Sequence, residues 1–442
     1  MTELGAGLSL LWVVPFAGMV LSLAVLPLTV PRWFHRDRNK ALVAIGWSLP
    51  VLVLLEVVRR GTGHHALLET AEEYVAFVVL LGSLFTISGG MYLTGNLLAT
   101  PRTNVAFLAV GALLANFIGT TGAACLLIRP ILRANSERRY VRHTVIFTIM
   151  VVANLGGLLT PLGDPPLFLG FLGGVDFFWT LRLLPQWALA VGLTLAIYYF
   201  IDRRFYARET PVSREEDIED YVPLGMAGKI NVVFLAGVIG AVLLSEPLHE
   251  IGSAIHFPFL RELIMVAMAV LSLRVGARAP RRWNQFTWAP IVEVAVIFAG
   301  IFTTMIPALA ILEARGAELG LTQPWQYFWL TGVLSSFLDN APTYLTFTAL
   351  AQGTLGVDGL AGLMSTTVTG GAAAAPAAFL AAISCGAVFM GANSYIGNAP
   401  NFMVKSIAEH TDVRMPSFFG YMGYSAAVLL PVFAIVTLVF FL

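Results

Sequence analysis

Charged residues are scarce in this chain: they make up 12% of its 442 residues, and the formal net charge at pH 7 is zero. Without an excess of basic residues, the composition gives no sign of a nucleic-acid partner. Cysteine is also scarce, and both cysteines, Cys125 and Cys385, lie in apolar segments. This excludes a disulfide framework or a thiolate metal site as the basis of the fold.

Apolar sequence is what the chain has in abundance, at 57% hydrophobic residues in runs that recur from end to end. A span needs about 20 largely apolar residues to cross about 30 Å of hydrocarbon. We therefore expect an all-α polytopic membrane protein. Residues 1–30 have no basic start and a long apolar run, so we expect a true first span and not a cleaved signal peptide.

Ten segments have the hydropathy of membrane spans. They lie near residues 8–30, 41–58, 73–95, 143–175, 178–201, 229–245, 259–275, 288–312, 375–409 and 416–441. Two further apolar segments, 105–128 and 325–350, are interrupted by "NFIGTT" (116–121) and "SSFLDNAPT" (335–343). The sequence leaves open, at this point, whether these two segments cross the membrane.

Loop charge predicts that they do not. Residues 31–40 and 129–142 are both strongly basic, which places both loops in the cytoplasm. Two spans separate the first loop from residue 96, so 105–128 begins and ends on the cytoplasmic side and is a re-entrant hairpin. Treating 325–350 as a hairpin from the outside leaves most basic residues cytoplasmic. Both termini are then external.

The same model divides the chain into two halves, 1–201 and 229–442, joined by a polar cytoplasmic linker at 202–228. Each half has five spans and one hairpin, and five is odd, so the second half enters the membrane inverted. The broken spans are 143–175 and 375–409, and the loop at 351–374 is expected to be flexible and external. Inverted repeats with discontinuous helices are typical of secondary transporters, whose site lies at the repeat interface.

Two short motifs explain why the spans would break. "LTPLGDPP" (159–166) and "NSYIGNAP" (393–400) each combine glycine, an Asp or Asn, and a proline two residues later. Proline removes a backbone donor and glycine permits a turn, so both motifs interrupt a helix. Backbone groups freed at membrane depth are tolerated only inside protein or beside an aqueous cavity. The breaks therefore predict a polar chamber where carbonyl ends bind a cation and amide ends favour an anion.

The predicted chamber is lined by oxygen-bearing and turn-forming residues of both halves. The first half contributes Asn116, Gly119, Thr120, Thr121, Thr160, Gly163 and Asp164, and the second contributes Asp339, Asn340, Thr343, Asn393, Ser394, Gly397, Asn398 and Asn401. Hydroxyl, amide and carboxylate oxygens suit a hard cation. We expect Na⁺ to be held by Thr120, Asp164, Asp339, Asn340 and Asn398, with no other cofactor.

Asp164 and Asp339 are the most informative single residues. An acid deep in a membrane is costly and usually marks an ion path or proton relay. The alternative is that each caps a helix end, which Asn does equally well. The ion-path interpretation is favoured because Asn398 occupies the position in the second motif that Asp164 occupies in the first.

Three motifs together resemble the ion transporter superfamily: "NLGGLLTPLGDPPLFLGF" (154–171), "GVLSSFLDNAPTYLTF" (332–347) and "GANSYIGNAPNFMVKSIAE" (391–409). They are most similar to its D-type bacterial sodium/proton antiporters and to the related chains described as citrate transporters, and less similar to arsenite permeases and sodium-coupled dicarboxylate carriers. The resemblance implies a scaffold domain, a transport domain with two hairpins and two broken helices, a homodimer, and the bacterial inner (plasma) membrane.

The resemblance leaves more than one function open. The first interpretation is a sodium/proton antiporter working by alternating access, because the predicted tips carry two acids and neither Arg nor Lys. The second is a Na⁺- or H⁺-coupled carrier of citrate or a similar carboxylate, which amide ends and Asn, Thr and Ser groups can bind. The hairpin tips lack the Ser-Asn-Thr triplets of dicarboxylate carriers. A channel or an intramembrane aspartyl protease fits the motifs less well, and we expect no enzyme.

Overall fold

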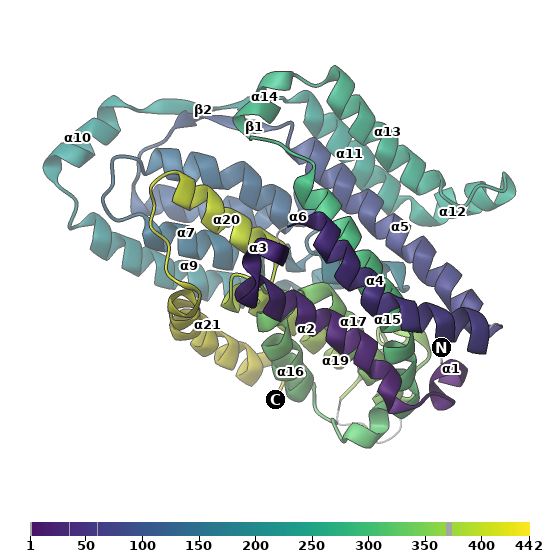
Figure 1. Cartoon of the computed structure of the whole chain (residues 1–442). Helices are drawn as coiled ribbons and strands as arrows, with labels where there is room; N and C mark the ends of the chain where they lie inside the picture. Colours follow the sequence, from purple (N-terminus) through teal and green to yellow (C-terminus); the bar gives the residue numbers. More distant parts are fainter. Residues whose placement is uncertain (1, 35, 60, 368–373) are drawn as a thin grey trace.

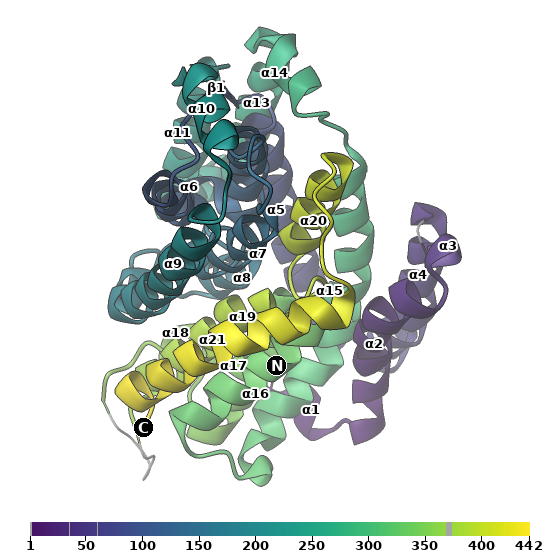
Figure 2. The same ribbon diagram turned by 90° about the vertical axis from the view of Figure 1, so that its left-hand side faces the viewer.

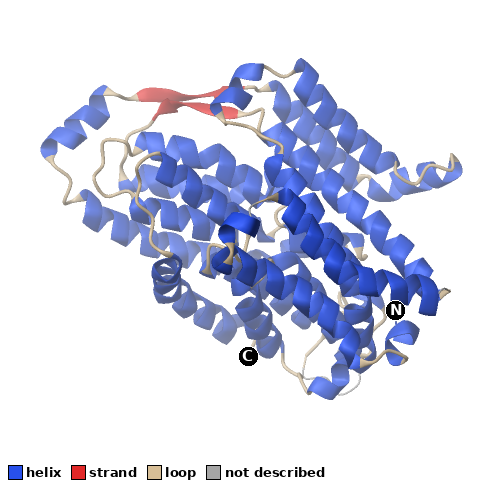
Figure 3. Cartoon of the chain, in the orientation of Figure 1, coloured by secondary structure: helices blue, strands red, loops and turns tan. Residues whose placement is uncertain are grey.

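The computed structural model describes residues 2–34, 36–59, 61–367 and 374–442, which are mostly helical (Figures 1 and 3). Among these residues, eight helices are long and apolar enough to cross a membrane, or nine if one bent pair counts as a span. Large apolar side chains such as Leu11, Val57 and Phe419 are exposed on their outer faces. The chain is thus an integral membrane protein, as its composition predicts.

The N-terminal helices form one edge of the molecule (Figure 2). They are α1 (Thr2–Ala6), a 3-10 turn (Leu10–Val13), α2 (Val14–Thr29), α3 (Pro31–Phe34), α4 (Asp37–Val53) and a π-turn (Leu54–Val58). α1, α2 and α4 pack on the long helix α15 (Ala289–Arg315). An ion pair joins them, because the buried Lys40 Nζ lies 2.8 Å from Glu293 Oε1.

A second group of helices packs on the other side of α15. It contains α5 (Thr62–Ser88), α11 (Ile230–Leu243), α12 (Ser245–Ala254), α13 (Leu260–Val275) and the short α14 (Arg278–Trp283). α11 and α12 form the bent pair, with an angle of 73°. α12 lies between the two spans predicted at 229–245 and 259–275.

Two short strands interrupt the all-helical pattern that the sequence predicts. β1 (Tyr92–Asn96) pairs antiparallel with β2 (Val222–Ala227), at one edge of the molecule (Figure 3). The expected linker at 202–228 also has more structure than its composition suggests. It contains the end of α9 (Leu184–Tyr206), the helix α10 (Pro211–Glu219) and β2. The Asp217 carboxylate accepts hydrogen bonds from the Ala99 amide at 2.9 and 3.2 Å.

α6 (Pro101–Ala134) folds back on itself and is therefore a hairpin. Gly119 has φ 75° and ψ 156°, a conformation that essentially only glycine adopts. The Asn104 and Asn135 side chains exchange two hydrogen bonds of 2.9 Å. A straight helix would separate these residues by about 46 Å, so the two arms must lie antiparallel with their tip at Gly119.

α16 (Pro324–Phe337) and α17 (Asn340–Leu355) form a second hairpin, which follows the short turn Gly316–Leu319. The Tyr327 hydroxyl lies 2.9 Å from Thr354 Oγ1, so the bases of the two arms are adjacent. The tip falls at Leu338 and Asp339. The segment after α17 contains the short helix α18 (Gly359–Gly362) among its described residues, and residues 368–373 of the loop predicted at 351–374 lie outside the described part of the chain.

Neither of the two segments predicted to be broken spans, 143–175 and 375–409, is one continuous helix. The first consists of α7 (Arg142–Val151), a 3-10 turn (Leu155–Leu158) and α8 (Pro165–Leu172), and the second of α19 (Pro376–Met390), a turn (Gly391–Asn393) and α20 (Ala399–His410). α19 lies at the centre of the molecule, because 83% of residues 376–393 are buried. The remaining helices are α9 (Leu184–Tyr206), preceded by the turn Trp179–Leu183, and α21 (Phe418–Phe440).

The two broken spans run in opposite directions. Arg142, at the start of α7, donates to the Arg414 carbonyl just beyond the end of α20, at 2.6 Å. At the other end of the molecule, the Asp176 amide beyond α8 lies 3.2 Å from Met364 Sδ. The Ala377 amide, at the start of α19, donates to Ser365. The start of α7 therefore lies with the end of α20 at one end of the molecule, and the end of α8 lies with the start of α19 at the other.

Candidate functional site

Asp164 is the point at which both hairpins and both broken spans meet. Its Oδ1 accepts hydrogen bonds from the Thr120 hydroxyl (2.8 Å) and the Asn398 amide (3.1 Å), and its Oδ2 accepts one from the Asn340 amide. Thr120 lies at the tip of the first hairpin, Asn340 at the tip of the second, and Asn398 at the second break. All four side chains are at most 4% exposed. We call these four residues the Asp164 cluster.

The local sequence explains why two of these side chains point into the cluster. Asp164 and Asn398 occupy the N-cap positions of α8 and α20, with extended backbones (φ −147° and −153°). Prolines at the first or second helical position remove one amide that a cap would otherwise bind. Neither side chain caps its own helix, so both are directed towards the other half of the molecule.

Backbone contacts hold the first hairpin tip against the first break. The Thr160 hydroxyl donates to the Asn116 carbonyl at 2.5 Å, and the Asn116 amide donates to the Gly156 carbonyl at 2.8 Å. The Thr120 amide donates to the Gly163 carbonyl at 2.8 Å. Gly163 must be glycine because an added Cβ would lie 2.2 Å from the Gly157 carbonyl oxygen.

The second tip is held against the second break by bonds of the same kind. The Ser394 hydroxyl donates to the Ser336 carbonyl at 2.5 Å, and the Ser336 hydroxyl donates to the Met390 carbonyl at 3.1 Å. Ser394 and Met390 follow Thr160 and Gly156 by 234 residues each. The two halves therefore use equivalent positions to build equivalent contacts.

Further bonds link the second break to the first. The Asn154 amide donates to Asn401 Oδ1 at 2.7 Å, while the Asn401 amide donates to the carbonyls of Gly391 and Ser394, both at 2.8 Å. Asn154 and Ser336 were not among the predicted site residues. Their signal was present, since both are polar residues within the three motifs at otherwise apolar depth.

The predicted site residues divide into three groups. Thr120, Asp164, Asn340 and Asn398 form the cluster, while Asn116, Gly119, Thr160, Gly163, Asn393, Ser394, Gly397 and Asn401 build the tips and breaks that support it. In the described part of the chain, the side chains of the other three residues form no hydrogen bond with the first two groups. Asp339 caps α17 by accepting from the Ala341 amide at 3.0 Å, and Thr343 donates to the Asp339 carbonyl at 2.9 Å. Thr121 is half-buried beside Thr120.

Four half-helices begin at the cluster: the second arm of α6, α8, α17 and α20. The N-terminal end of a helix carries a partial positive charge and free amide donors. Four such ends at one place favour a negative group, although Arg and Lys side chains form no hydrogen bond with the cluster in the described residues. Asp164 itself supplies one negative charge there.

The cluster also offers oxygen atoms to a cation. Asn340 Oδ1 is buried without a hydrogen-bond partner in the described part of the chain, and the same is true of Asn154 Oδ1 and Asn393 Oδ1. Together with the Asp164 carboxylate and the Thr120 hydroxyl, these are hard ligands of the kind Na⁺ takes. No three His, Cys, Asp or Glu side chains of the described part come together as a metal site. The sodium ligand set stays a prediction.

Comparison with known proteins gives one family. A family model described as "Putative citrate transport" matches residues 5–441, nearly the whole chain. No curated protein gives a significant match. The match agrees with the resemblance to citrate transporters that the three motifs carry, and it gives no support of its own to the resemblance to sodium/proton antiporters.

Proposed function

Because the chain belongs to the putative citrate transport family, we propose that it is a secondary active carrier of citrate or a related carboxylate, coupled to Na⁺ or H⁺. One observation carries the proposal. A single buried carboxylate, Asp164, receives hydrogen bonds from both hairpin tips and from the opposite broken span. A residue with those partners can sense whether either hairpin has moved.

The helix ends account for carboxylate binding without a cationic side chain. An anion at the cluster would be attracted by the amino-terminal ends of α8, α17, α20 and the second arm of α6. Hydroxyl and amide groups of Thr120, Asn340 and Asn398 would donate to its oxygens. This is the arrangement by which discontinuous helices bind anionic substrates in secondary transporters.

Asp164 supplies a reason for coupling. A citrate carboxylate beside the Asp164 carboxylate brings two like charges together in a buried place, which is unfavourable. A bound Na⁺ ion or a proton on Asp164 removes that repulsion. Citrate and the cation would therefore bind together more tightly than either binds alone, and their movements would be coupled.

The opposite directions of the two interrupted segments suggest an inverted repeat, the arrangement on which alternating access would depend. We propose that 1–201 and 229–442 are inverted repeats and that the hairpins are re-entrant, entering from opposite membrane faces. In support, α7 and α20 extend about 15 and 18 Å from the breaks, close to half of a 30 Å hydrocarbon core. The homodimer, the bacterial inner membrane and the external termini belong to the same proposal.

Labelled citrate uptake into liposomes that contain the purified full chain tests the function. We expect uptake when an inward Na⁺ gradient or an inward proton gradient is imposed, and none when both gradients are absent. Substituting each gradient for the other identifies the coupling ion. If neither gradient drives uptake of citrate or other di- and tricarboxylates, the carrier proposal is wrong.

A sodium/proton antiporter is the second candidate. The observation that favours it is the charge around the cluster, where Asp164 and Asp339 are acidic and no basic side chain of the described residues forms a hydrogen bond with the cluster. The same liposomes separate the two functions. An antiporter would dissipate an imposed pH gradient when Na⁺ is added without citrate, whereas a citrate carrier would do so only when citrate is present.

A further inference from the structure

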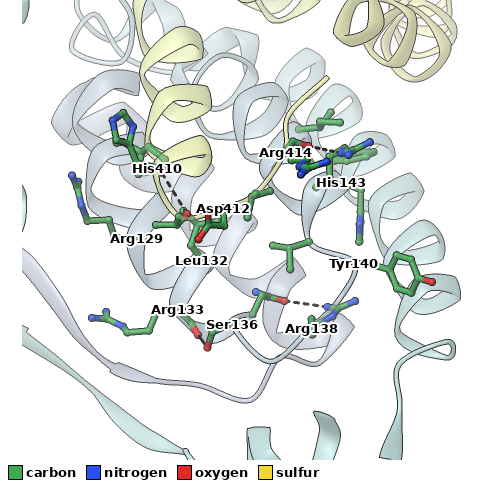
Figure 4. Close-up of a pocket in the computed structure, with 18 of the residues that line it drawn as sticks. Arg129, Leu132, Arg133, Ser136, Arg138, Tyr140, His143, His410, Asp412 and Arg414 are labelled. Carbon is green, nitrogen blue, oxygen red and sulfur yellow. Dashed lines mark hydrogen bonds between the residues drawn. The ribbon is translucent and has the colours of Figure 1, made fainter. Parts of the chain in front are cut away.

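A cavity of about 1150 Å³ opens at the outer end of α7 and α20, on the side of the molecule where the first hairpin has its base (Figure 4). It is lined by the end of α6, the connector 135–141, the start of α7, the outer end of α9, the chain beyond α20, and α21. α7 and α20 lead from this cavity to the Asp164 cluster, about 15 to 18 Å away along their axes. We call it the arginine cavity.

Its lining is strongly basic. Six arginines (Arg129, Arg133, Arg138, Arg139, Arg142 and Arg414) and two histidines (His143 and His410) face it, whereas Asp412 is the one acidic residue in the lining. Figure 4 shows Arg129, Arg133, Arg138 and Arg414 on different sides of Asp412. The chain as a whole carries no net charge, so this concentration is local.

Some of these arginines are already held by the protein. Arg138 is buried and pairs with Asp202 at 2.5 Å, and Arg133 donates to Tyr92 Oη and to the Leu93 carbonyl at 2.8 and 2.7 Å. These two shape the wall of the cavity. Asp202 is also 2.8 Å from His143 Nε2, so its charge is used within the wall and does not neutralise the other arginines.

Arg139 and Arg414 are different. Both are exposed at the mouth, and in the described part of the chain neither guanidinium has a hydrogen bond or an ion pair. The Arg139 guanidinium carbon lies 5.7 Å from the centre of the Tyr140 ring, and the Arg139 backbone amide donates to Glu209 Oε2 at 3.1 Å. A planar guanidinium presents a fork of donors that matches carboxylate and phosphate groups. These two forks are available to a ligand.

We propose that the arginine cavity is a binding site for a small multivalent anion, one carrying two or more carboxylate or phosphate groups, separate from the Asp164 cluster. Its volume of about 1150 Å³ is slightly above the usual range of about 300–1,000 Å³ for small-molecule sites, so it has room for such an anion. Several guanidinium groups spread around one space favour several anionic groups over one. Free di- and tricarboxylates and the headgroups of acidic phospholipids share this chemistry. The proposal does not depend on the transport function.

Binding of citrate and of pyrophosphate to the purified full chain, measured calorimetrically at low ionic strength, tests the site. The double variant Arg139→Gln/Arg414→Gln should weaken binding at least about tenfold, since each lost guanidinium removes a charge-assisted contact. Arg278→Gln removes an exposed charge on α14, outside the cavity, and should leave affinity unchanged. Arg139→Lys/Arg414→Lys keeps both charges, and its affinity should lie between that of wild type and that of the double Gln variant. Added salt should weaken wild-type binding.

A second arm identifies the source of the anion. Native mass spectrometry of the protein with added cardiolipin measures how much lipid is bound. If citrate displaces the lipid, both use the cavity. If the amount of bound lipid is the same in wild type and in Arg139→Gln/Arg414→Gln, the site takes the free anion. The proposal is overturned if the double variant binds citrate, pyrophosphate and cardiolipin as wild type does. The proposal is also overturned if Asp164→Asn abolishes all citrate binding, because citrate would then bind only at the Asp164 cluster; the transport proposal would stand. If the wild-type protein binds citrate in the arginine cavity but does not transport it, the transport proposal is wrong and the binding site stands.

Discussion

Replacing Asp164 with asparagine removes one charge from the centre of the site while nearly preserving its shape. Asn keeps an oxygen that can accept from Thr120 and Asn398, at the present 2.8 and 3.1 Å. Its new amide would face the amide of Asn340, which is a clash of donors. Rotation of the Asn340 amide relieves this, because the oxygen of that amide has no hydrogen-bond partner among the residues that the structure describes.

The effect on folding should therefore be small. Hydrogen bonds to a charged group stabilise by about 1.5–3 kcal/mol and neutral ones by about 0.5–1.5 kcal/mol. The loss over three bonds is offset by removing a buried charge, whose desolvation costs several kcal/mol. We expect the free energy of unfolding to change by no more than about 2 kcal/mol.

The effect on transport should be large. A unit charge at 4 Å from a cation contributes about 4 kcal/mol at the effective dielectric constant of protein sites. Losing that interaction lowers cation affinity by about a thousandfold. Citrate uptake into liposomes under an imposed Na⁺ or proton gradient should fall to the level of empty liposomes.

The matched control is Asp176→Asn. Asp176 is exposed beyond α8 and accepts from the Phe178 amide at 2.9 Å, which Asn can also do. This variant should transport as wild type does. Wild-type uptake by Asp164→Asn, in a preparation that melts and elutes like the parent, would refute the role given to the carboxylate.

Three further substitutions separate structural from functional roles. Gly119→Ala should lower the melting temperature, because it forces a side chain into a conformation costing about 1–3 kcal/mol, whereas Gly192→Ala, with nothing within 4 Å of an added Cβ, should not lower it. Asp339→Ala should reduce the free energy of unfolding by about 1 kcal/mol through loss of the α17 cap; equal loss in Asp339→Asn would show that capping is not its role. Arg138→Gln should destabilise by up to about 3–5 kcal/mol, since it breaks the buried ion pair with Asp202. Asp202 would keep its contacts with His143 at 2.8 Å and Asn104 at 3.2 Å. A melting curve like that of the parent would contradict the ion pair seen here.

Much of the fold could be predicted because its causes are local. The hydropathy of the spans, the prolines at 161, 165 and 166, and the glycine at the first hairpin tip each act on their own stretch of chain. The strand pair could not be predicted. Its partners are more than 120 residues apart, and neither short segment alternates clearly enough to indicate a strand.

The sequence alone favoured the antiporter over the citrate carrier for a similar reason. The sequence shows two acids and no base at the tips, which favours a cation passenger. It does not show that four helix amino-terminal ends would meet there and supply positive potential without any charged side chain. The family match supports the carboxylate substrate, and backbone geometry explains how the site could accept it.

The sequence by itself determined that this is a membrane protein and that its helices break at 159–166 and 393–400, since burial of apolar residues and the backbone limits of Pro and Gly need no partner. Only the tertiary structure decided which polar groups meet. Asp164 and Asp339 look alike in the sequence, yet the first receives bonds from Thr120 and Asn398 across the molecule while the second caps its own helix. Hydrogen bonds between residues 44 and 234 positions apart exist only after packing has brought the helices together.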